Sequence, residues 1–380
     1  MRRSTLTAVL LALVSVVAAA PPGVASAQAA SPGDEDDAWW RDLRVDAFID
    51  GYYLADWNRP ADPGANSDGI VHRAFDRNHG FGLAFAGLGA RYATEDVGLT
   101  VDLRFGGAQA ALIAAPVAEY VALKEAYASW RPTDALQLDV GQFDTLYGGE
   151  SADSWRNPNY TRGALYFMQP FYHLGLRATW DLGCLVLRGM VVNGTNLAVT
   201  DDNQSPHLGL QAIVLPADDV EIAAGYYTGA SSSGYGAAAA PGDDDQWEHF
   251  FDLVLRAAFF DRLRLALNGS LYVSAPDDDA LFYGIALTAA VDVSSMVALA
   301  LRGELLGDTA ALVTQGQYER LGTLTATLDV RPLPQLVLRL DTRLEVSDTD
   351  LYADQDTQRT GALRSTYLSS TLGVVVTTDP

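Results

Sequence analysis

The residues of this sequence that are best suited to chemistry are charged side chains spaced two positions apart. They are Asp102 and Arg104, Arg302 and Glu304, and the run Arg339, Asp341, Arg343 and Glu345. Because successive side chains of an extended chain point to opposite faces, each set lies on one face of its segment. Opposite charges along one face suit contact with water and dissolved ions rather than a packed core.

Patterns that would indicate an enzyme or a metal site are missing. No H-x-x-x-H or H-E-x-x-H spacing occurs among the five histidines, which are His72, His79, His173, His207 and His249. No G-x-S-x-G nucleophile elbow occurs either. We therefore predict no catalytic residue, no metal site and no cofactor. A hydrolase stays open as an alternative, because a Ser/His/Asp triad assembles in space and not in sequence order.

Three acidic runs fall in segments expected to be loops, at residues 201–202, 243–245 and 277–279. Carboxylate clusters can hold Ca²⁺ or Mg²⁺, which would bridge to anionic lipopolysaccharide. The spacing of an EF-hand, with its central Gly and terminal Glu, is missing. We favour solvated loops for these runs.

The composition excludes several classes of protein. A formal charge of -23 argues against a nucleic-acid partner, whose phosphates require a basic surface. Cys184 is the only cysteine, which excludes disulfides within the chain and a thiolate zinc cluster. Lys124 is the only lysine, so nearly all of the positive charge is guanidinium, which stays ionised wherever it lies.

The N-terminus has the pattern of an export signal. Arg2 and Arg3 precede an apolar run over residues 6–20, and the small-residue site Ala25-Ser26-Ala27 follows. We predict a signal peptide at residues 1–27, an N-terminal acidic segment at 28–40 and one β domain at 41–380. Beyond the signal no apolar stretch reaches the roughly 18 residues of a spanning helix, so only a closed barrel of strands could cross a membrane.

Apolar and polar residues alternate with period two along the rest of the chain. One example is the segment 97–105, in which Val97, Leu99 and Val101 alternate with small or charged residues. The alternation predicts about 16 strands. We expect them to begin near Leu43, Asn78, Val97, Glu119, Ala135, His173, Cys184, His207, Val220, Trp247, Leu263, Leu281, Val297, Tyr318, Gln335 and Ala362.

Strand length and connection length both favour a membrane protein. Most of the expected strands run for about 10 to 13 residues, which suits a tilted span, whereas strands of globular proteins average about 5 to 6. Short turns alternate with long loops along the chain. The predicted fold is therefore all-β, a transmembrane antiparallel up-and-down barrel with short periplasmic turns and long external loops.

Two sets of site residues follow from this fold. Side chains at the polar alternate positions of the strands are expected to line the pore. They include Asp102, Arg104, Arg177, Arg256, Arg302, Arg339, Asp341 and Arg343. The loop from Asp144 to Tyr172 is the longest and carries several aromatic side chains, so we expect it to fold inward and narrow the pore. Its constriction residues are predicted to be Asp144, Glu150, Asp153, Arg156 and Arg162, with the two arginines pairing with wall carboxylates.

A resemblance to a known family supports this interpretation. The motifs that carry it are Gly141-Gln142-Phe143-Asp144-Thr145, Gly148-Gly149-Glu150, Asn157-Pro158-Asn159-Tyr160-Thr161-Arg162 and His173-Leu174-Gly175-Leu176-Arg177. Over residues 120–194 the chain resembles the OmpL-like β-barrel porins. The resemblance implies an outer-membrane porin-like barrel and no catalytic residues. The chain departs from many outer-membrane barrels because it ends on Asp379-Pro380 rather than on an aromatic residue.

The expected function is that of an outer-membrane channel for passive diffusion of ions and small hydrophilic solutes, because about 16 to 18 strands leave an aqueous lumen. The expected partners are outer-membrane lipid and lipopolysaccharide, the solutes themselves and no nucleic acid. A homotrimer is expected only by analogy with porins of similar strand number. Two alternatives stay open, a closed outer-membrane barrel that acts in adhesion or structure, and an outer-membrane hydrolase.

Overall fold

The computed structural model describes residues 39–66, 70–73, 79–106, 123–196, 205–230, 247–275, 281–309 and 313–378. Residues 42–380 form one compact unit, and residues 1–41 belong to another. Three parts of the sequence discussed above lie outside the described residues. They are the expected signal peptide at 1–27, residues 28–38 of the acidic segment and the three acidic runs. The account below therefore concerns the second unit.

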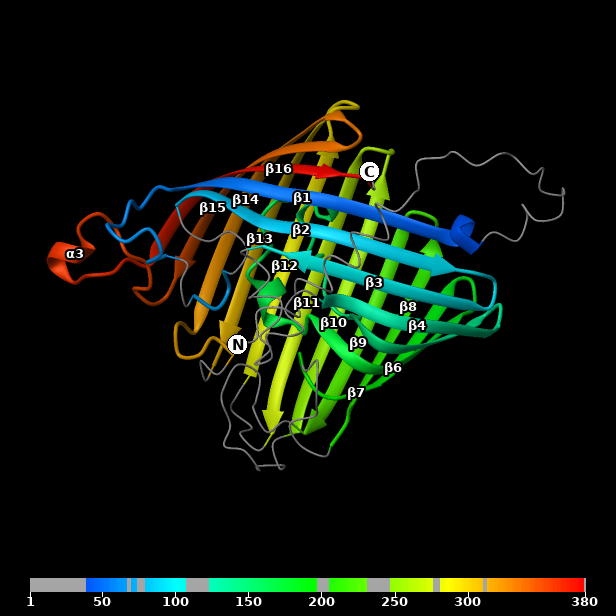
Figure 1. Ribbon diagram of the computed structural model, residues 1–380. Coiled ribbons are helices and arrows are strands. Elements are labelled where there is room, and N and C mark those ends of the chain that lie inside the picture. Colours follow the sequence, from blue (N-terminus) through cyan, green and yellow to red (C-terminus); the bar gives the residue numbers. More distant parts are fainter. Residues whose placement is uncertain are drawn as a thin grey trace, which may run out of the picture. The chain divides into compact units, whose positions relative to one another are not determined.

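Sixteen antiparallel strands form a closed barrel in which each strand pairs with its neighbours in the sequence (Figure 1). The strands are β1 (Leu43–Asp56), β2 (Gly80–Ala93), β3 (Val97–Phe105), β4 (Leu123–Thr133), β5 (Leu136–Asp144), β6 (Tyr172–Asp181), β7 (Leu185–Val192), β8 (His207–Ala217), β9 (Val220–Ala230), β10 (Trp247–Phe259), β11 (Leu263–Ala275), β12 (Leu281–Asp292), β13 (Val297–Asp308), β14 (Arg320–Leu333), β15 (Leu336–Ser347) and β16 (Thr366–Thr377). Pairing of β1 with β16 closes the ring. The predicted fold and strand number are confirmed.

The strand boundaries follow the alternation closely, and each expected start lies within four residues of the observed one. The difference is four residues at β16, which begins at Thr366 rather than Ala362. The preceding residues bend back instead, because Arg364 forms an isolated bridge with Tyr352. Residues 119–122, which were expected to open the fourth strand, lie outside the described residues.

Helical segments among the described residues are short. They are η1 (Trp39–Asp42), η3 (Ser154–Arg156), η4 (Leu165–Met168) and α3 (Thr357–Thr360). Within the described part of the chain, no helix is long and apolar enough to cross a membrane.

The two faces of the wall differ in the way the alternation predicts. On β15 the charged side chains Arg339, Asp341 and Glu345 point inward and are at most 1% exposed, whereas Leu340 points outward and is 43% exposed. A soluble protein would place these faces the other way round. An apolar outer face with charged residues inside is the arrangement of a barrel surrounded by lipid.

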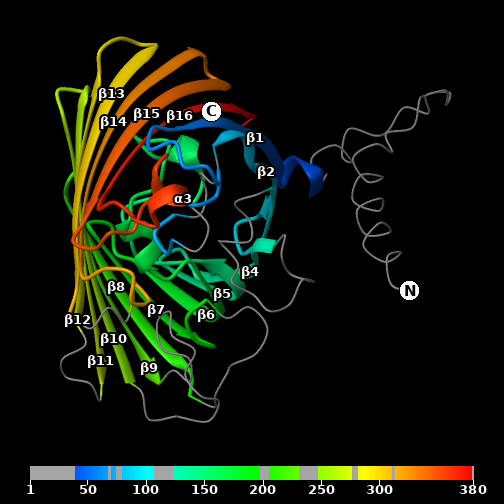
Figure 2. The ribbon, with the colours of Figure 1, turned by 90° about the vertical axis from the view of Figure 1, so that its left-hand side faces the viewer.

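The interior of the barrel is not empty. The connection between β5 and β6, green in Figure 2, lies within the ring of strands. Its Leu165 and Met168 pack with Phe250 and Phe282 of the wall in a buried apolar cluster. A second cluster joins Tyr160 of the same connection to Phe48 and Phe85 of β1 and β2. The core of the protein therefore lies between this connection and the inner face of the wall.

We predict that a charged side chain on the outer face destabilises the barrel more near the middle of the membrane than near its edge. Leu340 lies midway along β15, whereas Leu333 lies at the short-turn end of β14 and is 58% exposed. Leu340→Arg should reduce the free energy of folding into lipid bilayers by about 2–4 kcal/mol, and Leu333→Arg by about 0–1 kcal/mol. Urea titration of both variants in vesicles measures the difference, and equal costs would contradict the orientation of the wall.

Candidate functional site

The connection at residues 145–171, here called the inner loop, crosses the interior between β5 and β6. Tyr160, Arg162 and Leu165 of this loop are at most 2% exposed. Irregular backbone at this depth needs a hydrogen-bond partner for each buried N–H and C=O group, because no regular ladder supplies one. The polar inner face of the wall supplies these partners.

Wall carboxylates accept hydrogen bonds from backbone N–H groups of the inner loop. Asp252 of β10 accepts from Gly148 at 2.9 Å, and Asp341 of β15 accepts from Thr161 at 2.7 Å. Glu304 of β13 accepts from the two consecutive amides of residues 164 and 165, each at 3.1 Å. These charge-assisted bonds hold the loop from three separate strands.

Wall arginines hold the carbonyl groups of the same loop. Arg302 donates to the carbonyl of Thr161 at 2.7 Å. Arg339 donates to the carbonyl of Ser154 at 2.6 Å, and Arg343 to that of Arg162 at 2.8 Å. A guanidinium presents five donors in a fixed plane, so it can satisfy a carbonyl and a neighbouring carboxylate together.

Two ion pairs connect loop carboxylates to buried arginines of the wall. The guanidinium of Arg104 contacts both carboxylate oxygens of Asp153, at 3.1 and 3.0 Å. Arg302 pairs with Glu150 at 2.6 Å. Burial opposes ionisation of Asp153, but Lys124 and Arg104 outweigh it and hold the pKa of this carboxyl below its usual value. Removing one partner of such a pair would leave a buried charge uncompensated.

The opposite side of the inner loop is fixed to β1. Asp50 accepts hydrogen bonds from the Ser154 hydroxyl at 2.7 Å and from the Tyr160 hydroxyl at 2.6 Å. Burial and the Asp50 carboxylate both raise the pKa of Tyr160 well above its ordinary value, so its hydroxyl stays a donor. The loop therefore reaches across the interior from β10 and β11 to β1.

Two glycines of the inner loop lie close to polar side chains. Gly148 has φ +92°, a backbone conformation that favours glycine, and a Cβ there would lie 2.2 Å from Gln169 Oε1. A Cβ on Gly163 would lie 2.2 Å from Glu304 Oε1. A larger residue at either position would therefore require the neighbouring side chain to move.

A second segment enters the interior from the long-loop side, near β13 to β16. His72 is fully buried, and its Nε2 lies 3.0 Å from Glu345 of β15. Arg73 contacts the same carboxylate at 3.4 Å, and the Tyr352 hydroxyl donates to it at 2.7 Å. Burial lowers the pKa of His72, and the adjacent Glu345 opposes the shift. The long-loop end of this part of the barrel is thus filled by buried side chains.

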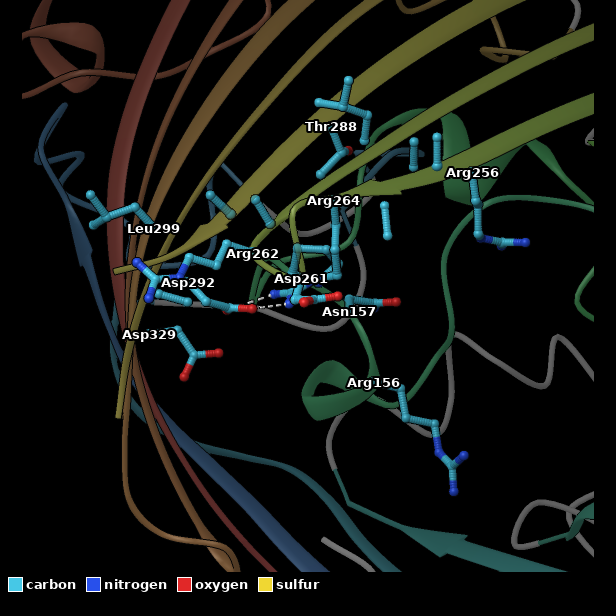
Figure 3. Close-up of a pocket in the computed structure, with 18 of the residues that line it drawn as sticks. Arg156, Asn157, Arg256, Asp261, Arg262, Arg264, Thr288, Asp292, Leu299 and Asp329 are labelled. Atoms are coloured by element: carbon cyan, nitrogen blue, oxygen red, sulfur yellow. Dashed lines mark hydrogen bonds and ion pairs between the residues drawn. The ribbon is translucent and has the colours of Figure 1, made fainter. Parts of the chain in front are cut away.

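The two larger cavities beside the inner loop lie between this loop and the wall. The first, here called the vestibule, has a volume of about 1170 Å³ and opens at the short-turn side along β8 to β15. In Figure 3, Arg156 of the inner loop lies well apart from Asp292 and Asp329 of the wall, and all three line the vestibule. The smaller cavity, here called the chamber, measures about 320 Å³ and lies between the inner loop and β7 to β10.

The vestibule and the chamber share four lining residues. Glu150 and Ser151 come from the inner loop, and Glu221 and Arg256 come from β9 and β10. Glu221 and Arg256 form an ion pair. The guanidinium of Arg256 also donates to the carbonyl of Gly149 at 3.2 Å. The two cavities therefore adjoin at this group, here called the junction.

The five loop residues singled out from the sequence occupy different positions. Asp144 lines the chamber and pairs with Lys124 at 2.7 Å. Glu150 lies at the junction, and Asp153 is buried against the wall. Arg156 lines the vestibule, stacks on Trp155 and lies 3.8 Å from Asp153. Arg162 is buried and donates to the carbonyl of Tyr160 at 2.9 Å.

The wall residues singled out from the sequence differ in their contact with water. Arg256 lines both cavities, and Arg177 pairs with Asp139 at 2.8 Å. The other six point inward as expected but are at most 3% exposed, and they are Asp102, Arg104, Arg302, Arg339, Asp341 and Arg343. The structure differs here from an open pore wall, because the inner loop and its partners cover these side chains.

Several residues of the site were missed from the sequence. Arg188 and Glu221 line the chamber, and Asp252 and Asn268 hold the start of the inner loop. Each stands at one of the alternate positions of its strand that carry polar side chains. The alternation therefore predicted that these side chains point inward. Their contacts with the loop depend on strand register, which spacing alone does not provide.

The fold, the apolar outer face and the loop-narrowed interior define a porin-like outer-membrane barrel. The family model described as "Putative beta-barrel porin-2, OmpL-like" matches residues 42–376. The chain belongs to this family, and it is a porin-like channel. No curated protein matches the sequence.

Solved structures of outer-membrane channels share the fold at low sequence identity. The outer membrane channel DcaP of Acinetobacter baumannii is 10% identical, with a TM-score of 0.57 over 88% of this chain and 96% of its own. An anion-selective porin from Comamonas acidovorans is 10% identical, with a TM-score of 0.57 over 88% and 99%. OprB of Pseudomonas putida is 11% identical, with a TM-score of 0.57 over 89% and 94%.

We predict that thiol accessibility separates the junction from the covered wall. In a Cys184→Ser background, Arg256→Cys should react with a water-soluble thiol reagent about tenfold faster than Arg302→Cys, because reactivity follows exposure. The side chain of Arg256 is 43% exposed and that of Arg302 is 0% exposed. Mass spectrometry of the labelled protein measures both rates. Equal rates would mean that the inner loop does not cover β13.

A second prediction concerns the ion pairs that fix the inner loop. Arg302→Met leaves Glu150 and Glu304 without their guanidinium partner and should lower the free energy of unfolding by about 3–5 kcal/mol. The matched control is Arg364→Met, which removes an ion pair on the external rim whose arginine is 54% exposed, and it should lower the free energy of unfolding much less. Urea unfolding from vesicles measures both. If the two substitutions lower the free energy of unfolding equally, the ion pairs of Arg302 do not hold the loop.

Proposed function

We propose that the protein allows passive diffusion of ions and small hydrophilic solutes along β7 to β11, from the chamber through the junction into the vestibule. The observation that carries this proposal is the shared lining of the two cavities at Glu150, Ser151, Glu221 and Arg256. Elsewhere the interior is filled by the inner loop and, at the long-loop end, by the buried His72–Glu345 contact. Conduction is thus confined to one side of the lumen.

In this proposal the inner loop is the constriction. Some of its residues line the narrow point, and others hold the loop in position. Glu150 and the carbonyl of Gly149 form the loop side of the junction, and Arg256 forms the wall side. Asp153, with Arg104, keeps the loop in position. Charges of both signs at a narrow point orient and sort polar solutes as they pass.

The proposed setting follows from the family. The barrel lies in the outer membrane, and we infer that residues 1–27 direct export. Outer-membrane lipid and lipopolysaccharide surround the apolar face, and a homotrimer is the proposed assembly. The proposed function is not enzymatic, and a closed barrel that acts in adhesion or structure is the outcome to expect if the purified protein does not conduct.

The test changes the width of the junction in both directions. Ser151→Trp should lower single-channel conductance in planar bilayers, and Arg256→Ala should raise it, each by about twofold or more if the junction is the narrowest point. The control is Arg364→Ala, whose side chain lies on the external rim away from both cavities. Stable conductance that none of these substitutions alters would place the route elsewhere, and a parent protein without channel steps would refute the proposed function.

A further inference from the structure

The chamber contains one guanidinium that makes no ion-pair contact with a described carboxylate, although Glu221 and Asp139 attract it from farther away. Arg188 of β7 lines the chamber, and its Nη1 donates to Gln211 Oε1 of β8 at 3.1 Å. Among the described residues no carboxylate lies within 4 Å of this guanidinium. Gln211 is itself 7% exposed and also donates to the carbonyl of Leu146 in the inner loop. The wall and the loop together therefore hold Arg188 in place.

Every carboxylate that lines the chamber already has a cationic partner. Asp144 pairs with Lys124 at 2.7 Å, and Glu150 pairs with Arg302 at 2.6 Å. Glu221 pairs with Arg256. The acidic residues around the chamber are thus compensated, and Arg188 gives it a local positive charge within a protein of strongly negative net charge.

Next to this guanidinium the chamber has apolar surface. Ile213, Ala223 and Val254 come from three neighbouring strands, and Phe171 and Tyr166 come from the inner loop. The chamber volume of about 320 Å³ is at the lower end of the range for small-molecule sites. A fixed charge beside an apolar wall in a space of this size is suited to a small amphiphilic ligand.

We propose that the chamber binds small organic carboxylates, with the carboxylate on Arg188 and an apolar body against β8 to β10. The proposal deepens the proposed function, because it names the solute class that the channel would hold on its route. A guanidinium can donate two parallel hydrogen bonds to a carboxylate. A neutral amide of the same shape accepts hydrogen bonds from the guanidinium less strongly than the carboxylate does. Recognition therefore depends on the charge of the solute as well as on its body.

The experiment uses two measurements so that the proposed function and this inference can fail separately. Conductance of the parent channel in KCl tests the route. Equilibrium binding of benzoate, benzamide and acetate to the purified barrel, followed by calorimetry, tests the chamber. Benzoate should bind at least about tenfold more tightly than benzamide, which lacks the charge, and more tightly than acetate, which lacks the apolar body.

Two variants identify the residue responsible. Arg188→Gln should weaken benzoate binding at least about tenfold, because it removes the charge-assisted bonds. The matched control Arg364→Gln removes an arginine on the external rim and should leave benzoate binding unchanged. The proposal is overturned if a conducting parent protein does not bind benzoate, if benzoate and benzamide bind alike, or if Arg188→Gln binds benzoate as the parent does. Equal binding of acetate would overturn the assigned role of the apolar wall.

Discussion

The structure depends on one constraint, which is that irregular backbone inside a membrane barrel must find hydrogen-bond partners on the wall. The inner loop has 27 residues between β5 and β6, at residues 145–171, and several of its amides and carbonyls are buried. Asp341 and Glu304 accept from its amides, and Arg339 and Arg343 donate to its carbonyls. The charged side chains that point inward from the strands are thus needed to fold the loop, as well as for contact with water.

This constraint also determines where solutes can pass. Glu304 of β13 and Asp341 of β15 accept hydrogen bonds from loop amides, and Glu345 near the external end of β15 contacts His72. The chamber lies along β7 to β10, and the vestibule lies at the short-turn side along β8 to β15. These cavities are the space that the inner loop and its wall partners leave unfilled.

The sequence predicted the fold because alternation with period two is a local property that each strand carries by itself. It also predicted the inward direction of Arg302, Arg339 and Asp341. It did not predict their burial, because whether a wall residue meets water or the inner loop depends on which loop atoms lie opposite it. Loop arginines were expected to pair with wall carboxylates, and that pairing stays a prediction. The contacts described above run from loop amides to wall carboxylates and from wall arginines to loop carbonyls. Arg188 was missed for the same reason, since only register brings it next to Gln211 and the chamber.

Hydrogen exchange of the inner loop in lipid nanodiscs tests the central claim most directly. The amides of Gly148, Thr161, Ala164 and Leu165 donate to wall carboxylates, so they should exchange as slowly as amides within the strands. An amide of the exposed α3 segment, such as Gln358, provides the fast reference. If the four loop amides exchange as fast as this reference, the loop is not held by the wall and the account is contradicted.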